Sequence, residues 1–155
     1  MSTRARVVGV GQRVAGDDGV GLAVLDELRR RSVPEGTELI HLADPMDLVS
    51  LLESGDRAVL VDAVLGSTPG RVVELGPEEL SRQAPLPASS HGLGAARAIQ
   101  LAGALSPGGA ASRLRVVAVT IHAPDRYRVG LSPEVAAAVP QAADHVLRLL
   151  GSRPR

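Results

Sequence analysis

The sequence predicts an α/β fold: a three-layer αβα sandwich in which helices cover both faces of a mostly parallel five-stranded sheet. Three observations support this prediction. Short continuous apolar runs, typical of strands buried on both faces, alternate with stretches of helical periodicity. One connection between two apolar runs is too short for a parallel crossover, so one strand is expected to be antiparallel. Hydrophobic residues make up 45% of the 155 residues, enough for one sizeable core.

The predicted strands are five apolar runs, each bounded by turn residues or by a helical stretch. We expect them at residues 5–10, 37–42, 58–64, 71–75 and 114–121. Only a turn at 66–70 separates the third run from the fourth, so these two strands are expected to pair as antiparallel neighbours.

The predicted helices combine an apolar face with recognisable start signals. We expect them at residues 19–31, 45–53, 92–105 and 133–150. Asp44-Pro45 and Ser132-Pro133 each place a capping residue before a proline at the first helical position. Residues 77–90 are rich in proline and serine and are expected to be irregular.

The chain is expected to form a single domain over residues 1–155, with a core from about 5 to 150 and a flexible tail at 151–155. The apolar run near the N-terminus is short and broken by glycine, which argues against a signal peptide. No segment approaches the roughly 20 apolar residues that a membrane helix needs. We therefore expect a cytoplasmic protein with no membrane partner.

The composition excludes several classes of function. All 17 basic residues are arginine, which rules out Schiff-base chemistry and a P-loop lysine. The chain has no cysteine and therefore no thiol nucleophile, thiolate ligand or disulfide. Tyr127 is the only aromatic residue and the net charge is zero, so neither base stacking nor a basic surface for nucleic acid is expected.

The loop between the first strand and the first helix is rich in glycine. Gly9-x-Gly11 invites a dinucleotide-binding interpretation, but the third glycine of that fingerprint would fall at Val14. Asp17 and Asp18 stand where a pyrophosphate would meet the helix N-terminus, and two carboxylates there would repel it. A nucleotide-binding enzyme is therefore disfavoured, although dinucleotide binding detected by calorimetry would revive it.

Asp17 and Asp18 have two alternative interpretations. Capping and a favourable interaction with the helix dipole would explain either aspartate alone, at about 1 kcal/mol. Gly19 and Gly21, however, lie in the first helical turn, where each glycine costs about 1 kcal/mol relative to alanine. Such glycines allow another backbone to approach closely, which favours a functional loop.

Asp62 and His91 are two further candidates for chemistry. Asp62 follows the apolar run at 58–61, where an ionised carboxylate is costly unless it is paired or bound to a metal. The alternative is that Asp62 caps the strand end through backbone N–H groups. His91 precedes the third helix, where a lone histidine is most often structural. A serine–histidine pair is disfavoured, because Ser89 and Ser90 are adjacent to His91 and form no nucleophile-elbow motif.

Asp18, Asp62 and His91 are expected to meet at one edge of the sheet, since the loops after parallel strands open at the same edge. Two carboxylates and one imidazole suit a divalent metal ion with coordination positions left open for a substrate.

Four segments, taken in order, resemble the [NiFe]-hydrogenase maturation endopeptidase family. They are the glycine-rich stretch at 9–21, the run at 60–64 followed by Pro69-Gly70, the segment 90–94 and the segment 130–135. The resemblance covers roughly residues 7 to 150. It implies a twisted five-stranded sheet between helices, and it places the family's metal-contacting residues at Asp18, Asp62 and His91.

The resemblance also implies an activity, which is removal of a C-terminal extension from a hydrogenase large-subunit precursor after nickel insertion. Nickel contributed by the precursor would be the cofactor, and Asp18, Asp62 and His91 would act through it as metal-binding and catalytic residues. The alternative is a non-catalytic, nickel-sensing assembly factor that holds the same precursor without cutting it. Gln12, where the family usually has Asn, and the 41–46 loop depart from the family pattern and leave the identity of the precursor open.

Overall fold

The computed structural model describes residues 4–82, 90–105, 113–123 and 128–151, with the backbone alone at 80–82 and 90–94. Within these ranges, five strands form one sheet in the order β2-β1-β3-β5-β4. The strands are β1 (Ala5–Val10), β2 (Thr37–Leu42), β3 (Arg57–Leu65), β4 (Val72–Leu75) and β5 (Leu114–Ile121). The helices are α1 (Val20–Arg30), α2 (Asp47–Glu53), α3 (Pro77–Arg82), α4 (Ser90–Leu105) and α5 (Pro133–Gly151), and a 3₁₀ segment, η1 (Arg13–Gly19), precedes α1.

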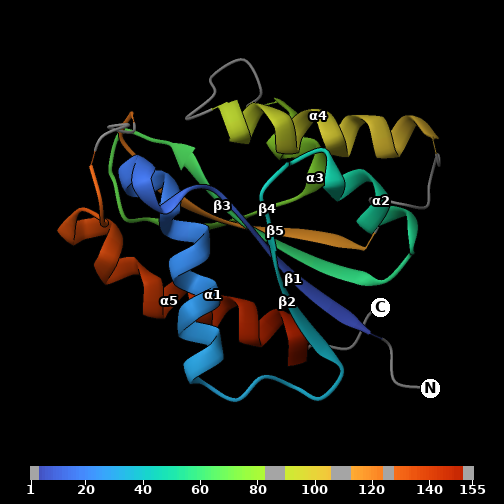
Figure 1. Ribbon diagram of the computed structural model, residues 1–155, viewed down its shortest axis with the longest axis horizontal. Helices are drawn as coiled ribbons and strands as arrows, with labels where there is room; N and C mark the ends of the chain where they lie inside the picture. The colour runs from blue at the N-terminus through green and yellow to red at the C-terminus, as the bar shows by residue number, and fades with distance from the viewer. Residues whose placement is uncertain (1–3, 83–89, 106–112, 124–127, 152–155) are drawn as a thin grey trace.

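Helices cover both faces of this sheet (Figure 1), which confirms the predicted α/β architecture. α1 and α5 pack on one face, and α2 and α4 pack on the other, where α3 also lies. Side-chain alternation along β3 sends Val59, Val61 and Ala63 into the first apolar cluster, and Leu60 and Val64 into the second. Both faces of β3 are therefore buried, as its continuous apolar sequence predicts.

The sheet is mostly parallel and has one antiparallel strand, as predicted, but that strand pairs differently. β4 pairs antiparallel with β5 at the sheet edge, so the predicted pairing of the third and fourth strands is wrong. The turn after β3 bonds to the end of β5, with Gly66 N–H donating to the Ile121 carbonyl at 3.1 Å and Gly70 N–H to the Thr120 carbonyl at 2.8 Å. The chain therefore passes the end of β5 before β4 begins, and β3 keeps a parallel neighbour on each side.

Helix α2 begins later than the sequence predicts. Its first residue is Asp47 rather than Pro45, because a tight turn precedes it. Asp44 Oδ1 accepts a hydrogen bond from the Met46 N–H at 2.9 Å. The Asp47 N–H donates to the Asp44 carbonyl and the Leu48 N–H to the Pro45 carbonyl, both at 3.1 Å. The two backbone bonds are of 3₁₀ type, and the regular helix begins two residues later than predicted.

Helix α3 lies in the segment expected to be irregular, so that expectation is wrong for residues 77–82. Pro77 takes the first helical position, and Glu79 Oε1 accepts a hydrogen bond from the Gly76 N–H at 3.3 Å. These are ordinary start signals of a helix. The remainder of the segment, residues 83–89, lies outside the described residues. α4 begins at Ser90, two residues before the predicted start.

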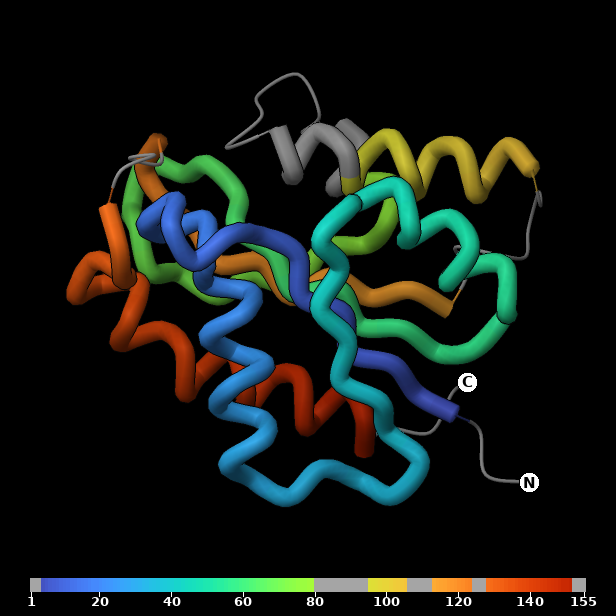
Figure 2. Tube along the Cα trace, viewed as in Figure 1, coloured from blue at the N-terminus to red at the C-terminus, as the bar shows by residue number. Residues whose placement is uncertain are grey.

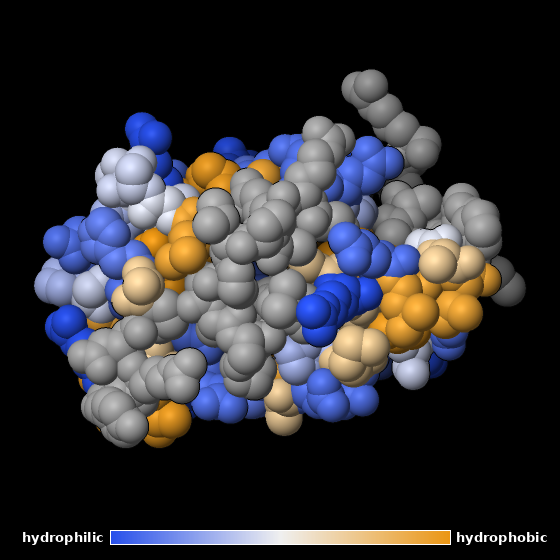
Figure 3. All heavy atoms as spheres, turned by 90° about the horizontal axis from the view of Figure 1, so that it is seen from above, coloured by the Kyte–Doolittle hydropathy of each residue, from blue (hydrophilic) through white to orange (hydrophobic). Residues whose placement is uncertain are grey.

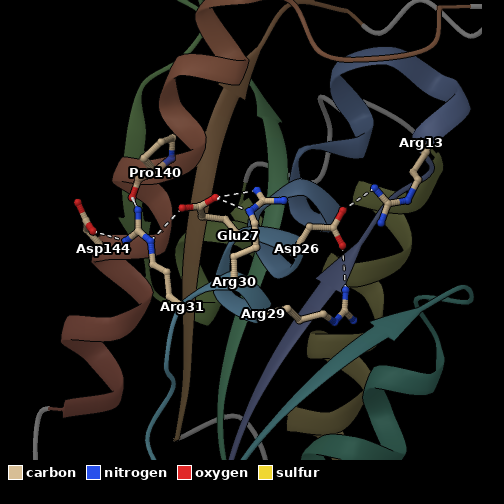
Figure 4. A network of polar contacts seen from close by, with 8 residues as sticks. All are labelled: Arg13, Asp26, Glu27, Arg29, Arg30, Arg31, Pro140 and Asp144. Atoms are coloured by element: carbon tan, nitrogen blue, oxygen red, sulfur yellow. Dashed lines mark hydrogen bonds and ion pairs between the residues drawn. The ribbon is translucent and has the colours of Figure 1, made fainter.

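Charged side chains connect α1 to η1 and to α5 (Figure 4). Arg13, at the start of η1, lies 2.8 Å from Asp26, and this hydrogen bond holds the pKa of Asp26 below its usual range. Near the end of α1, Arg31 bonds to Glu27 at 3.0 Å and also to Asp144 of α5. Because these side chains are exposed to solvent, the pairs contribute little to stability and mainly connect the elements.

Figures 2 and 3 show the course of the chain and the surface over α4. The start of β1 and the end of α5 lie toward the same side of the molecule, away from η1 (Figure 2).

Hydrophobic side chains gather near the last turns of α4 (Figure 3), where Leu101 and Leu105 expose 42% and 59% of their surface. Across the described helices, none combines the length and apolar character needed to cross a membrane.

Candidate active site

The carboxyl ends of β1 and β3 lie side by side at the topological switch point of the sheet, where the strand order reverses direction. α1 carries the chain from β1 to β2 over one face, whereas α2 leads from β2 to β3 over the other. The β1–β3 ladder ends with the pair Gly9–Val61, but β3 continues beside β5 as far as Leu65. Asp62 is thus the first residue of β3 beyond its ladder with β1, in the position where α/β proteins commonly bind ligands.

The predicted glycine loop after β1 folds into η1, which consists of two short helical pieces separated by a kink. Glycine allows this loop to lie directly against the strands. Gly11 has a φ of +138°, and a Cβ there would stand 2.1 Å from the carbonyl oxygen of Asp18. A Cβ at Gly21 would stand 2.6 Å from the carbonyl oxygen of Val61. The expected close backbone approach is therefore present, and the approaching backbone belongs to the chain's own loop and strands.

The two adjacent aspartates of η1 have different surroundings. Asp17 faces the start of α5, where its Oδ1 accepts a hydrogen bond from the Ser132 N–H at 2.7 Å and its Oδ2 accepts one from the Ser132 hydroxyl at 2.8 Å. Asp18 is 1% exposed, and neither of its carboxylate oxygens has a hydrogen-bond partner among the described residues. The capping interpretation is wrong for α1, because Gly19 holds the cap position and no side chain caps the helix.

Asp62 is buried to the same degree, with 1% of its surface exposed. Its Oδ1 accepts a hydrogen bond from the Ala63 N–H at 2.8 Å, whereas its Oδ2 has no partner in the part of the chain that the structure describes. Burial raises the pKa of Asp62 to about 8; the Ala63 N–H opposes this rise and the charge of Asp18 adds to it. Asp62 therefore makes one strand-end hydrogen bond and remains a buried acid beside a second carboxyl.

Asp18 and Asp62 together present three buried carboxylate oxygens that meet no hydrogen-bond donor within the described ranges. Leaving such groups without a partner is costly. A divalent cation bound by both carboxylates would satisfy these oxygens and would favour the ionised form of Asp62 over its protonated form. The donor set therefore fits a metal ion.

The structure places His91 in the first turn of α4, as the second residue of that helix. Asp62 lies two residues from both Leu60 and Val64 along β3, so the three side chains point to the same face of the sheet. That face is the one covered by α2 and α4. The side chain of His91 lies outside the described residues, and its contact with Asp18 and Asp62 stays a prediction. Among the side chains that are described, no third carboxylate or histidine completes a metal-binding group.

Two of the other described histidines, His41 and His145, have partners of their own, and the third, His122, is exposed after β5. His41 Nε2 lies 3.4 Å from the carbonyl oxygen of Gly11, beside the loop that holds Asp18. His145 Nε2 lies 3.0 Å from Glu74 Oε2, between α5 and the edge strand β4. Neither joins the carboxylate pair.

Sequence reasoning missed the contact between Asp17 and Ser132. Ser132 does stand immediately before α5, where its carbonyl accepts a hydrogen bond from the Ala136 N–H at 2.8 Å, and Pro133 takes the first helical position as predicted. The Ser132 hydroxyl, however, donates to Asp17. The Ser132-Pro133 pair was a signal for the helix start, but nothing local to either segment indicates the contact between them.

Several known proteins are similar to this chain in sequence and in fold. A family model for hydrogenase maturation proteases, HycI, matches residues 23–149. Protein FrxA of Pyrococcus furiosus is 31% identical over 137 residues, which cover 87% of this chain and 96% of FrxA. The hydrogenase maturating endopeptidase HybD from E. coli superimposes with a TM-score of 0.80 at 26% identity, covering 95% of this chain and 91% of that one. The [NiFe] hydrogenase maturation protease HybD from Thermococcus kodakarensis has a TM-score of 0.72 at 26% identity, with coverage of 95% and 99%.

The fold and these relatives define the class of protein as a protease, a hydrolase that acts on peptide bonds. More narrowly, the chain belongs to the hydrogenase maturation protease family. The resemblance noted in the sequence is thereby confirmed at the level of the family.

Proposed function

We propose that this protein removes the C-terminal extension of a [NiFe]-hydrogenase large-subunit precursor that already carries nickel. The observation that supports this most strongly is the buried carboxylate pair. Asp18 and Asp62 are each 1% exposed, and three of their four oxygens have no hydrogen-bond partner among the described residues. Two such groups are costly as bare charges, and they suit a metal ion that arrives with the substrate.

In this proposal, Asp18, Asp62 and His91 are ligands to the nickel carried by the precursor. Bound there, the metal ion would polarise the scissile carbonyl or activate a water molecule. No side-chain nucleophile is required, which agrees with the absence of cysteine from the sequence. The task of the chain is to hold the two carboxylates in place and to keep bulk water away from them, and their burial between η1 and β3 suits that task.

The relatives support the choice of partner. HybD from Thermococcus kodakarensis is a [NiFe] hydrogenase maturation protease, and HybD from E. coli is a hydrogenase maturating endopeptidase. We propose a hydrogenase large-subunit precursor as the partner here, with its scissile peptide bound at the carboxyl edge of the sheet, beside η1.

Intact-mass analysis of a candidate precursor tests this function. Nickel-loaded and nickel-free precursor are each incubated with the wild-type protein and with Asp62→Asn, which retains an acceptor for the Ala63 N–H but removes the charge. We expect a C-terminal peptide to be lost only from the nickel-loaded precursor, and only with the wild-type protein. Equal cleavage of the nickel-free precursor would contradict the role of nickel. A precursor that binds without being cut would favour the nickel-sensing assembly factor.

A further inference from the structure

We propose that Asp17 is a positioning residue: by binding Ser132, it fixes the backbone of η1 so that the carboxylate of Asp18 stays beside Asp62. This inference rests on the proposed function of the Asp18–Asp62 pair. It concerns the residue next to the metal ligand rather than the ligand itself.

The contact between Asp17 and Ser132 uses both carboxylate oxygens. One accepts the backbone N–H of Ser132 at 2.7 Å and the other accepts its hydroxyl at 2.8 Å. Hydrogen bonds donated to a charged carboxylate are stronger than those between neutral groups, and two of them fix orientation as well as distance. Ser132 directly precedes α5, a helix of 19 residues, so η1 is joined to the start of a long, well-packed element.

A second bond joins η1 to the same segment. The Gly16 N–H donates to the carbonyl of Arg128 at 2.7 Å. Gly16 has φ 60° and ψ −126°, which interrupts the helical geometry of η1. A kinked 3₁₀ segment has little stability of its own. Its shape therefore depends on the bonds that Gly16 and Asp17 make with residues 128 and 132.

Asp18 needs such support because its own side chain receives none. Neither carboxylate oxygen has a hydrogen-bond partner among the described residues, so the position of this side chain is set by its backbone. On one side, the Asp18 carbonyl packs against Gly11. On the other, the preceding residue is held by Ser132. Removing the Asp17 carboxylate would release one of these two restraints and let the Asp18 carboxylate move away from Asp62.

Three substitutions distinguish a positioning role of Asp17 from a contribution to the stability of the fold alone. Asp17→Ala removes both hydrogen bonds. Asp17→Asn retains an acceptor for the Ser132 N–H, and its amide can donate to the Ser132 hydroxyl oxygen. Asp144→Ala is the matched control, because Asp144 bonds to Arg31 and thereby also joins the α1 region to α5, but at the opposite end of α1.

The test is calorimetric titration of Ni²⁺ alone into the metal-free wild-type protein and the three variants, with thermal melting to establish that each is folded. Loss of a residue that orients metal ligands typically weakens metal binding 10–100-fold. We expect a loss of about that size for Asp17→Ala, and affinities within a few-fold of wild type for Asp17→Asn and Asp144→Ala. With nickel-loaded precursor, Asp17→Ala should lower kcat more than it raises KM.

The outcomes distinguish this inference from the proposed function. If the wild-type protein binds nickel and folded Asp17→Ala binds it equally well with unchanged kcat, the positioning role is wrong and the metal site stands. If the wild-type protein binds no Ni²⁺ by itself, the reaction with nickel-loaded precursor decides. An unchanged kcat for folded Asp17→Ala would contradict the positioning role, whereas precursor left uncut by the wild-type protein would contradict the proposed function. Should Asp17→Ala not fold, Ser132→Ala replaces it, since it loses only the hydroxyl bond; nickel affinity equal to wild type would then contradict the inference.

Discussion

At the level of single residues, the buried carboxyl of Asp62 lowers the free energy of unfolding as the pH rises. Its pKa is about 8 in the folded protein and near 3.8 in an unfolded chain, so between these values the folded state holds a proton that the unfolded state has released. The unfolded state therefore binds fewer protons, and the free energy of unfolding falls as the pH rises from about 4 to about 8. We propose that this loss of stability accompanies a role of the same buried carboxyl in binding a metal ion.

Asp62→Asn should make the protein more stable, and increasingly so at higher pH. Asparagine cannot ionise and can still accept a hydrogen bond from the Ala63 N–H. One pKa unit corresponds to about 1.4 kcal/mol, so we expect the difference from wild type to grow by a few kcal/mol between pH 5 and pH 8. Urea unfolding at both pH values measures it, with the exposed substitution Asp144→Asn as control. A variant less stable than wild type at pH 8 would contradict this account of Asp62.

His91→Ala should abolish processing of the precursor without unfolding the protein. We expect this because His91 is the proposed third metal ligand and stands at the end of a helix, where alanine is well tolerated. Intact-mass analysis of the precursor and a thermal melt of the variant measure the two effects. Cleavage by the folded variant at the wild-type rate would remove His91 from the site.

The residues predicted from sequence were those whose local context is unusual. Asp62 stands out because it is a carboxylate in an apolar strand, and Asp18 because it lies among glycines at a helix start. Asp17 looked like a helix cap for the same reason. Its true contact is 115 residues away, with Ser132, and no local pattern encodes a contact at that separation.

At the scale of elements, the start of α1 depends on a glycine that no other residue can replace without strain. Gly21→Ala would ordinarily stabilise a helix by about 1 kcal/mol. Here the new Cβ would meet the carbonyl oxygens of Val61 at 2.6 Å and Val10 at 2.9 Å. We expect destabilisation of roughly 1–3 kcal/mol, the usual cost of overpacking.

The matched control for Gly21→Ala is Gly103→Ala, in the last turn of α4, where no described atom outside the local helix backbone lies within 4 Å of the added Cβ. This second substitution should stabilise the protein by at most about 1 kcal/mol, so the two variants should shift the urea midpoint in opposite directions. A Gly21→Ala variant that is as stable as wild type would show that α1 does not need this close approach to β1 and β3.

Elements with a strong local pattern were predicted well, and those defined by distant partners were not. The ranges of β1, β2 and β5 agree in full with the continuous apolar runs. The neighbour of β4 was wrong because a short turn indicates only a reversal of direction; the bonds from Gly66 and Gly70 to the end of β5 decide which strand comes next. α3 was missed because the proline-rich composition of 77–90 outweighed the Pro77 and Glu79 start signals.

At the scale of the whole molecule, the order of the strands creates the candidate site. β1 and β3 are central, parallel neighbours, and the helix that follows β1 (α1) and the helix that precedes β3 (α2) lie on opposite faces. The residues that follow β1 and those that end β3 therefore lie at one edge of the sheet. The sequence could predict this edge because parallel strands place their carboxyl ends together. It could not predict that Asp18 and Asp62 would be fully buried, because that depends on how tightly η1 packs against the strands.

We propose that Asp18, Asp62 and His91 form a nickel site, and anomalous diffraction at the nickel absorption edge tests this proposal most directly. Crystals of the wild-type protein and of Asp62→Asn would be soaked in Ni²⁺. We expect one strong anomalous peak within bonding distance of both carboxylates and the His91 imidazole in the wild-type protein, and none there in the variant. The proposed nickel site would be contradicted if nickel in the wild-type crystal lay only at other histidines, such as His41 or His145, with none at the carboxylate pair.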